Sequence, residues 1–171
     1  LSYGIVGGCS IDQFGIPISD TTVRMCRKSD AILLGAVGGP KWDDPEATVR
    51  PEQGLLRLRK DLKLFANIRP IKVFDQLIDS TPIKPSVLRG VDMVVVRELT
   101  GGLYFGKPKR RWMTSMGRKA VDSLLYSEHE IKRILKVGFD LACRRRKKLT
   151  SVDKANVLQS SMLWRELALE I

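Results

Sequence analysis

An acid, a leucine and an arginine fall on one face of a predicted helix. Glu52, Leu55 and Arg59 stand at positions i, i+3 and i+7, which share a helix face. A core-facing stripe would be aliphatic throughout, so this mixed stripe could grip a small molecule with an anionic end and an aliphatic branch. Arg69 and Arg97 follow at the ends of apolar runs. Three guanidinium groups can converge on a dicarboxylate through bidentate forks, although spacing alone favours three surface arginines.

Two further residues have side chains that could act as a base and an acid. Lys154 follows Asp153 where a strand is expected to lead into a helix, and a lysine acts as a base only when its surroundings lower its pKa toward neutrality. Tyr104 lies in a segment flanked by glycines, which let backbone or ligand approach closely. Solvated charges at a helix start and a packing tyrosine are the commoner outcomes for such residues.

Strands and helices alternate along the chain, which indicates an α/β protein. Continuous apolar runs at residues 31–35 and 91–96 predict strands buried on both faces. The other extended segments expected are residues 5–9, 65–74 and 149–152, with a turn and short strand at 100–106. The loops expected are residues 12–18, the glycine turn 35–40, and the basic, irregular stretch 107–119.

Four helices are expected from their end signals. Ser19 or Asp20 can cap a helix that reaches Lys28. Pro51 suits the first position of a helix that reaches about Leu62. The capping box of Ser127 and Glu130 predicts a third helix, and a last helix is expected from about Ala155 onward.

The composition suggests anionic partners. The 171 residues carry a net charge of +11 and have a sequence pI near 9.9, which is typical of proteins that bind nucleic acid, anionic lipid or acidic small molecules. The basic runs 107–111 and 144–148 could bind phosphate backbones, but no aromatic residues are interleaved in them. No apolar run is long enough for a membrane helix. The single histidine and three dispersed cysteines offer no metal-binding spacing.

The chain resembles the metal-dependent β-hydroxyacid oxidative decarboxylases, the isocitrate/isopropylmalate dehydrogenase family. Long matching stretches carry the resemblance: residues 29–42, 50–70, 96–106 and 147–166. Leu55, within Glu52-x-Gly54-Leu55-Leu56, suits an isopropyl group, so the isopropylmalate branch fits better than the isocitrate branch. The resemblance implies an incomplete two-domain α/β fold, with residues 1–64 in the nucleotide-side domain and 65–171 in the substrate and dimerisation domain.

The resemblance also implies a role for each candidate residue. Arg59, Arg69 and Arg97 would clamp the malate carboxylates, and Leu55 would contact the isopropyl branch. Tyr104 and Lys154 would be the catalytic acid and base. The NAD site would be lined by Gly39, Pro40, Lys41, Trp42, Glu52 and Asn156.

The implied reaction is the NAD-dependent oxidative decarboxylation of 3-isopropylmalate to 2-oxoisocaproate in leucine biosynthesis. The implied enzyme is a cytoplasmic homodimer whose Lys154 enters the neighbouring subunit's site. The implied Mg²⁺ or Mn²⁺ has no acidic trio in residues 1–171, so its ligands are expected downstream and the chain is interpreted as an internal fragment, inactive alone. The alternatives left open are a basic nucleic-acid-binding module and a related malate or tartrate dehydrogenase.

Overall fold

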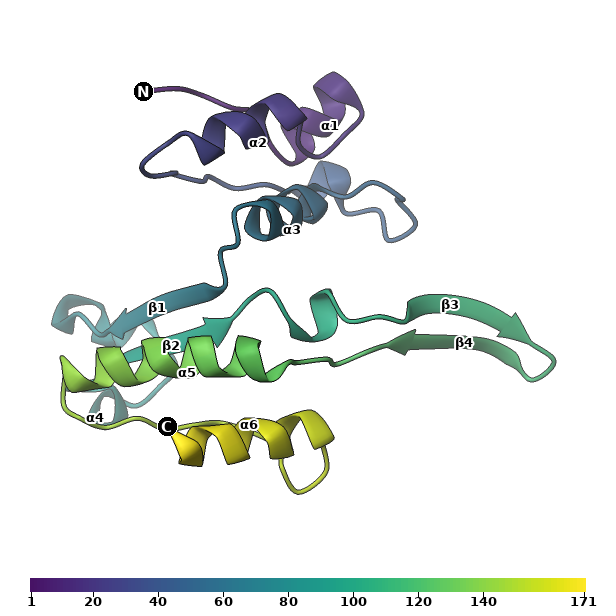
Figure 1. Ribbon diagram of the computed structural model, residues 1–171. Coiled ribbons are helices and arrows are strands. Elements are labelled where there is room, and N and C mark those ends of the chain that lie inside the picture. The colour runs from purple at the N-terminus through teal and green to yellow at the C-terminus, as the bar shows by residue number, and fades with distance from the viewer. The chain divides into compact units, whose positions relative to one another are not determined.

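The chain divides into two compact units, Leu1–Leu64 and Phe65–Ile171. The computed structural model describes all 171 residues, and its mixture of helices and strands agrees with the expected fold class (Figure 1). Its two sheets are separate antiparallel pairs, β1–β2 and β3–β4. The roles expected for the two parts, nucleotide binding and dimerisation, remain predictions.

The first unit is helical. Its elements are α1 (Gly8–Phe14), α2 (Asp20–Arg27), the 3-10 helix η1 (Pro40–Trp42) and α3 (Pro51–Asp61). Ser19 caps α2, because its Oγ accepts a hydrogen bond from the Thr22 amide at 3.1 Å. Pro51 occupies the first turn of α3. Both helix starts are as expected.

A small apolar core holds this unit together, made by Ile18, Val23, Cys26 and Leu58. Gly54 allows α3 to approach the chain before α2, because a Cβ there would lie 2.5 Å from the Pro17 carbonyl oxygen.

Three expectations for the first unit are wrong. The strand expected at residues 5–9 is reduced to a single bridge between Val6 and Ile18, and α1 occupies part of the expected loop 12–18. Residues 31–35 form no strand and are exposed. An apolar run becomes a buried strand only when neighbouring strands pair with it and other elements cover it, and these residues have no paired strand.

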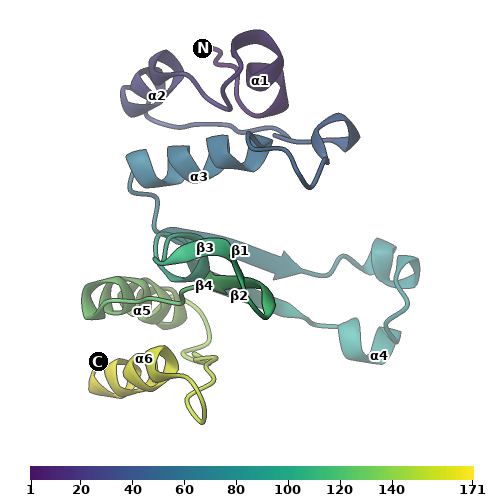
Figure 2. The same cartoon turned by 90° about the vertical axis from the view of Figure 1, so that its right-hand side faces the viewer.

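The second unit is built on the antiparallel pair β1 (Ala66–Lys72) and β2 (Asp92–Glu98). Between them lie the 3-10 helix η2 (Asp75–Ser80) and the short helix α4 (Pro85–Leu88). Helix α5 (Glu128–Cys143) packs against β2, and α6 (Gln159–Glu170) packs against α5. Figures 1 and 2 show α5 between the sheet and α6.

Helix α5 has a fully buried face, where Ile131 and Leu135 meet Leu167 of α6. Its predicted capping box is confirmed: the Ser127 amide donates to Glu130 Oε2 at 2.8 Å, and the Glu130 amide donates to Ser127 Oγ at 3.4 Å. The helix therefore begins where its local sequence specifies.

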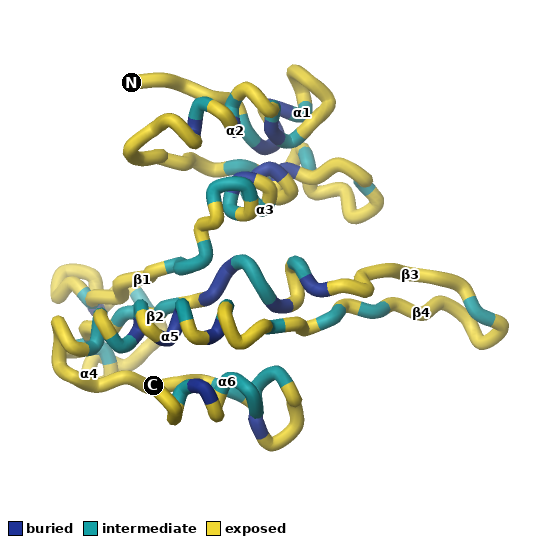
Figure 3. The backbone as a smooth tube through the Cα atoms, viewed as in Figure 1, coloured by how far each residue is buried: buried dark blue, intermediate teal, exposed yellow.

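Strand β2 is buried on one side only. The side chains of Val94 and Val96 are partly covered and Glu98 is buried, whereas Met93 and Val95 are 50% and 43% exposed (Figure 3). The expectation of a strand at 91–96 is right, but burial on both faces is wrong, because α5 packs against one face of this strand and alternate residues on the other face stay exposed.

The basic stretch expected to be irregular forms a hairpin. Strands β3 (Lys109–Thr114) and β4 (Gly117–Asp122) pair antiparallel, with Trp112 opposite Lys119. Gly117 has φ 106° at the turn, a conformation that favours glycine. Almost every hairpin residue is exposed (Figure 3).

Three smaller expectations in the second unit also fail. Residues 102–104 form a 3-10 helix, η3 (Gly102–Tyr104), instead of a short strand. Residues 149–152 form no strand. The last helix begins at Gln159 instead of near Ala155, because a turn occupies residues 155–157.

Candidate functional site

Two of the three predicted substrate arginines share one face of the β1–β2 sheet. Arg97 is paired with Asn67, and Arg69 stands two residues further along β1, opposite Val95. Residues i and i+2 of a strand point to the same side, so the two guanidinium groups are diagonal neighbours on the face away from α5. Arg69 also donates from Nε to Asn67 Oδ1. The sheet therefore presents two cations together, as a dicarboxylate requires.

Tyr104 joins this face. The Arg97 guanidinium carbon lies 5.5 Å from the centre of the Tyr104 ring, within the range of a cation–π contact. Helix η3 carries Tyr104 back toward β2, and its side chain stays half exposed. The predicted acid and a predicted carboxylate-binding arginine are thus brought together.

A buried carboxylate that the sequence did not reveal anchors this arrangement. Glu98 directly follows Arg97, and its side chain is only 1% exposed. It accepts hydrogen bonds from the Thr100 and Gly101 amides at 2.8 and 2.7 Å and from Arg133 Nη2 at 2.8 Å. Arg133 in turn lies over the Phe65 ring, 4.7 Å from its centre. Glu98 therefore fixes the turn that leads from Arg97 to Tyr104.

The glycines of this turn leave room for Tyr126. A Cβ on Gly101 or Gly102 would lie 2.8 Å or 2.5 Å from a Tyr126 atom, and Gly102 has φ +73°. Burial raises the pKa of the Tyr126 phenol, and Glu98 adds to the effect. The turn cannot accept side chains without moving.

The predicted base Lys154 sits on a turn. Lys154 and Asn156 are exposed, whereas Ala155 between them is buried. The neighbouring Asp153 carboxylate is paired with Arg165 of α6 at 2.7 Å. The hydrogen bond from Arg165, and to a smaller extent the one from the Ala155 amide, lowers the pKa of the Asp153 carboxyl.

In the first unit, helix α3 carries the remaining predicted substrate residues. Leu55 and Arg59 are partly covered and Glu52 is exposed. A different arginine of this helix has a structural role: Arg57 binds Asp20 and, at 3.5 Å, Asp61.

The loop predicted to bind NAD is held by α1. Asp12 accepts hydrogen bonds from Lys41 Nζ at 2.7 Å and Trp42 Nε1 at 3.2 Å, and the bond from Lys41 holds the pKa of the Asp12 carboxyl below its ordinary value. Gly8 faces the Trp42 ring so closely that a Cβ would lie 2.4 Å from it. Asp12 was missed from sequence because it is about 30 residues away along the chain.

Glu52 is placed beside this loop. A Cβ on Gly38 would lie 3.2 Å from Glu52 Oε1. The structure thus brings one predicted cofactor residue of α3 next to the glycine turn 35–40, within the first unit.

No three His, Cys, Asp or Glu side chains of the chain form a group that could hold a metal ion. None of the helices combines the length and the apolar character that crossing a membrane requires.

Comparison with known proteins decides the family. A family model described as isocitrate/isopropylmalate dehydrogenase matches residues 1–171. The chain belongs to this family. The 3-isopropylmalate dehydrogenases of Dehalococcoides mccartyi strain CBDB1 and Geobacillus kaustophilus strain HTA426 are 59% and 57% identical to it, over 170 and 169 residues.

The match covers 99% of this chain but 47% and 46% of those two proteins. The chain therefore spans about half the length of the curated relatives it matches.

Solved structures agree with the family assignment. An isocitrate dehydrogenase from Methylococcus capsulatus superposes with a TM-score of 0.70 at 28% identity, covering 97% of this chain and 46% of that one. An apo β-decarboxylating dehydrogenase from Thermococcus kodakarensis gives a TM-score of 0.65 at 30% identity, covering 99% of this chain and 44% of that one. The incomplete dehydrogenase fold expected from the sequence is confirmed.

Proposed function

We propose that the chain is part of an enzyme that oxidises and decarboxylates 3-isopropylmalate with NAD, in leucine biosynthesis. The observation that carries the proposal is the shared sheet face of Arg69 and Arg97, with Tyr104 against Arg97. The names of the relatives at 57–59% identity support the same substrate. The assays use a protein of the relatives' full length that contains residues 1–171, and this protein is called the full-length enzyme.

The arginines bind the substrate. Arg69 and Arg97 of the second unit pair with malate carboxylate oxygens through charge-assisted hydrogen bonds. Arg59 of α3 is the carboxylate-binding residue proposed for the first unit. Leu55 contacts the isopropyl branch, and its aliphatic side chain disfavours the third carboxylate of isocitrate. These contacts fix the hydroxyl-bearing carbon for reaction.

Lys154 and Tyr104 move protons at the two ends of the reaction. Lys154 takes the hydroxyl proton at the start of the reaction. Residues 39–42, Glu52 and Asn156 are the residues that would hold NAD, and NAD would supply the acceptor for the hydride from the carbinol carbon. The resulting β-keto acid loses carbon dioxide, and Tyr104 donates a proton to the enol carbon. No group of three His, Cys, Asp or Glu side chains in residues 1–171 could hold the family's divalent metal.

We further propose a cytoplasmic homodimer with shared sites. The three cysteines are free, which suits a reducing compartment. The β3–β4 hairpin supports the dimer, because an isolated two-stranded hairpin is marginal in water and both faces of this one are exposed.

Nucleic-acid binding has weaker support. Part of the basic run 144–148 is used internally: Arg145 binds the Asp92 carboxylate at 2.8 Å, and Arg146 donates to the Asp92 carbonyl. A strongly salt-dependent affinity for duplex DNA would favour this alternative.

Mixed dimers of the full-length enzyme test the proposal. Lys154→Met and Arg97→Met should each be inactive alone. If Lys154 serves the partner's site, both lesions collect in one site of a mixed dimer and leave the other site whole. NADH production should therefore return after subunit exchange. Confirmed exchange with activity at background would exclude the shared site, and an active Lys154→Met homodimer would exclude Lys154 as the base.

A further inference from the structure

The Asp153 side chain is an almost fully covered carboxylate beside an exposed lysine. It is 7% exposed, and both of its oxygens are used by one guanidinium group. Arg165 Nη2 donates to Oδ1 at 2.7 Å and Arg165 Nε donates to Oδ2 at 3.1 Å. This is a bidentate fork, which fixes the orientation of both partners as well as their separation.

The same carboxylate fixes the backbone of the turn. Asp153 Oδ1 also accepts from the Ala155 amide at 3.0 Å. On the other side, the Lys154 carbonyl accepts from the Val157 and Leu158 amides, both at 3.0 Å. The backbone at Lys154 is therefore held from both directions while its side chain remains in solvent.

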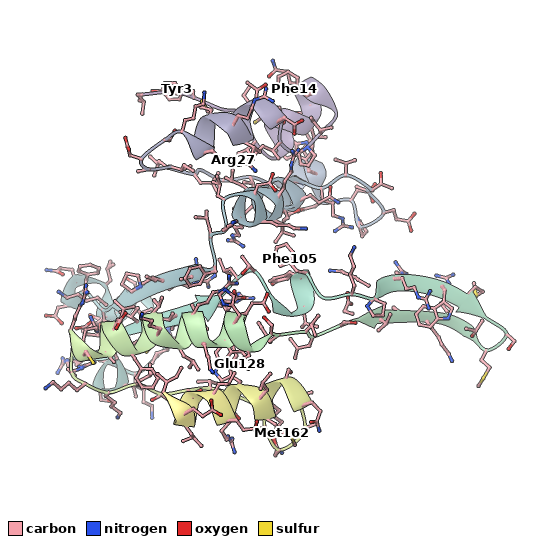
Figure 4. The ribbon with its side chains drawn as sticks, viewed as in Figure 1. Tyr3, Phe14, Arg27, Phe105, Glu128 and Met162 are labelled. Carbon is pink, nitrogen blue, oxygen red and sulfur yellow. The ribbon has the colours of Figure 1, made fainter.

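Helix α6 holds the segment at a second point. Trp164, the neighbour of Arg165, donates from Nε1 to Ser151 Oγ at 3.2 Å. The Trp164 ring also meets Tyr126 edge-on, with centroids 5.6 Å apart. Met162, in the first part of α6, is labelled in Figure 4. Two adjacent residues of α6, Trp164 and Arg165, thus donate hydrogen bonds to Ser151 and Asp153, which are two residues apart in the chain.

From this geometry we propose that Asp153 and Arg165 are positioning residues for Lys154 and Asn156. The fork orients Asp153, Asp153 fixes the turn, and the turn sets the direction in which the lysine and the asparagine side chains leave the backbone. The inference rests on the proposed role of Lys154 as the base. A misplacement of about 1 Å can cost about 100-fold in rate, so a loosened turn should slow proton removal.

A merely structural ion pair would behave differently. Such a pair would stabilise the packing of α6, and its loss would lower the number of folded molecules without changing the rate of each folded site. The test must therefore separate the rate per site from the amount of folded enzyme.

The experiment compares five variants of the full-length enzyme, of which Lys154→Met serves as the inactive reference. Arg165→Met removes the fork, and Arg165→Lys keeps a positive charge without the fork. Asp153→Asn keeps an acceptor for the Ala155 amide but weakens the pair with Arg165. It is the substitute test if Arg165→Met does not fold. The matched control is Asp92→Asn, which weakens another carboxylate–arginine pair of the second unit, 2.8 Å long. Active sites are counted by titration with NADH.

Three quantities are measured: kcat per site, KM for isopropylmalate, and the isotope effect on kcat with substrate deuterated at the carbinol carbon. Arg165→Met should lower kcat per site by about 10- to 100-fold and leave KM within about twofold. Its isotope effect should rise, because the chemical step has become slower relative to product release. Arg165→Lys and Asp153→Asn should fall between this variant and wild type, and Asp92→Asn should match wild type.

Two results overturn the inference: a kcat per site equal to wild type in Arg165→Met and Asp153→Asn, or an equal loss in Asp92→Asn. Lys154→Met separates this outcome from failure of the proposed function. If Lys154→Met is inactive and Arg165→Met is normal, Lys154 keeps its role and the positioning role is wrong. If Lys154→Met remains active, the proposed base is wrong.

Discussion

The two antiparallel pairs of the second unit have the same number of strands but different surroundings. The pair β1–β2 is covered on one face by α5 and anchored by the buried Glu98–Arg133 contact. The pair β3–β4 is exposed on both faces, and its Lys109–Asp122 contact is 3.6 Å long and exposed at both ends. Each pair also carries an arginine over an aromatic ring, Arg97 over Tyr104 and Arg110 over Trp112.

This difference shows what makes a strand pair able to hold a site. Backbone pairing alone orders two strands weakly, whereas burial of one face and a satisfied internal carboxylate fix the other face as a platform. The covered pair carries Arg69, Arg97 and, through the following turn, Tyr104. The exposed pair has the features of a surface for association, which agrees with the proposed dimer.

The largest expected effect is on the anchor of the covered pair. Glu98→Ala leaves Arg133 largely buried without its anionic partner and frees the Thr100 and Gly101 amides. Removing one partner of a buried ion pair costs about 3–5 kcal/mol. Urea denaturation of the full-length enzyme should therefore show a decrease of that order in the free energy of unfolding.

The matched control is Glu128→Gln, which removes an exposed ion pair between Glu128 and Lys132 within α5. Exposed pairs contribute about 0–1 kcal/mol, and this variant should unfold almost like wild type. Similar losses in the two variants would contradict the anchoring role of Glu98.

The covered pair should also be the one that matters for activity. Arg97→Lys keeps the charge but loses the bidentate fork. The value of kcat/KM for isopropylmalate should therefore fall, by an amount that corresponds to a loss of about 2–3 kcal/mol in transition-state binding. Arg110→Lys makes the same change at the other ring-stacked arginine, 5.1 Å from Trp112, and should leave kcat/KM unchanged. Unchanged kinetics for Arg97→Lys would remove it from the carboxylate clamp.

Sequence reasoning found the elements whose signals are local. Pro51 at a helix start and the Ser127–Glu130 capping box act over a few residues, and both helices begin as predicted. The apolar run at 31–35 was misjudged because burial depends on distant strands that would have to lie beside it. The hairpin was missed because lysines and arginines interrupt the alternation that marks a strand.

The site was predicted in its residue types but not in its supports. Arg97 and Tyr104 were named, and the sheet register and η3 bring them together. Glu98, Asp12 and Asp153 were not named as supports, because their partners are Arg133, Lys41 and Arg165, which lie 35, 29 and 12 residues away. An acid next to a predicted site residue, such as Glu98 after Arg97, is the signal that was available.

For the exposed pair, association is the property to measure. Trp112→Ala removes the largest apolar side chain of the hairpin, and tryptophans are frequent anchors of interfaces. We expect dimer association to weaken by about 1–2 kcal/mol in sedimentation at several concentrations, with the unfolding of the second unit unchanged. Phe74→Ala, an exposed aromatic residue outside the hairpin, is the control. Equal weakening in both variants would contradict an association surface on the hairpin.

The smallest effect concerns pH and compares the carboxylates at the ends of the two pairs. The hydrogen bond from Arg145 lowers the pKa of Asp92, at the start of β2, below its ordinary 3.8. A carboxyl whose folded pKa is depressed stabilises the fold at pH values above its unfolded pKa, and this contribution is lost as the pH falls through the folded pKa. The free energy of unfolding of wild type should therefore exceed that of Asp92→Asn at about pH 5, and the gap should narrow below about pH 4.

Asp122→Asn, at the end of β4, is the matched substitution. Its contact with Lys109 Nζ is 3.6 Å long, longer than a hydrogen bond, so at about pH 5 this substitution should change the free energy of unfolding less than Asp92→Asn does. Urea titrations of both variants and wild type at the two pH values give the comparison directly. If the gap for Asp92→Asn stays constant as the pH falls, the Arg145 contact does not couple folding to protonation.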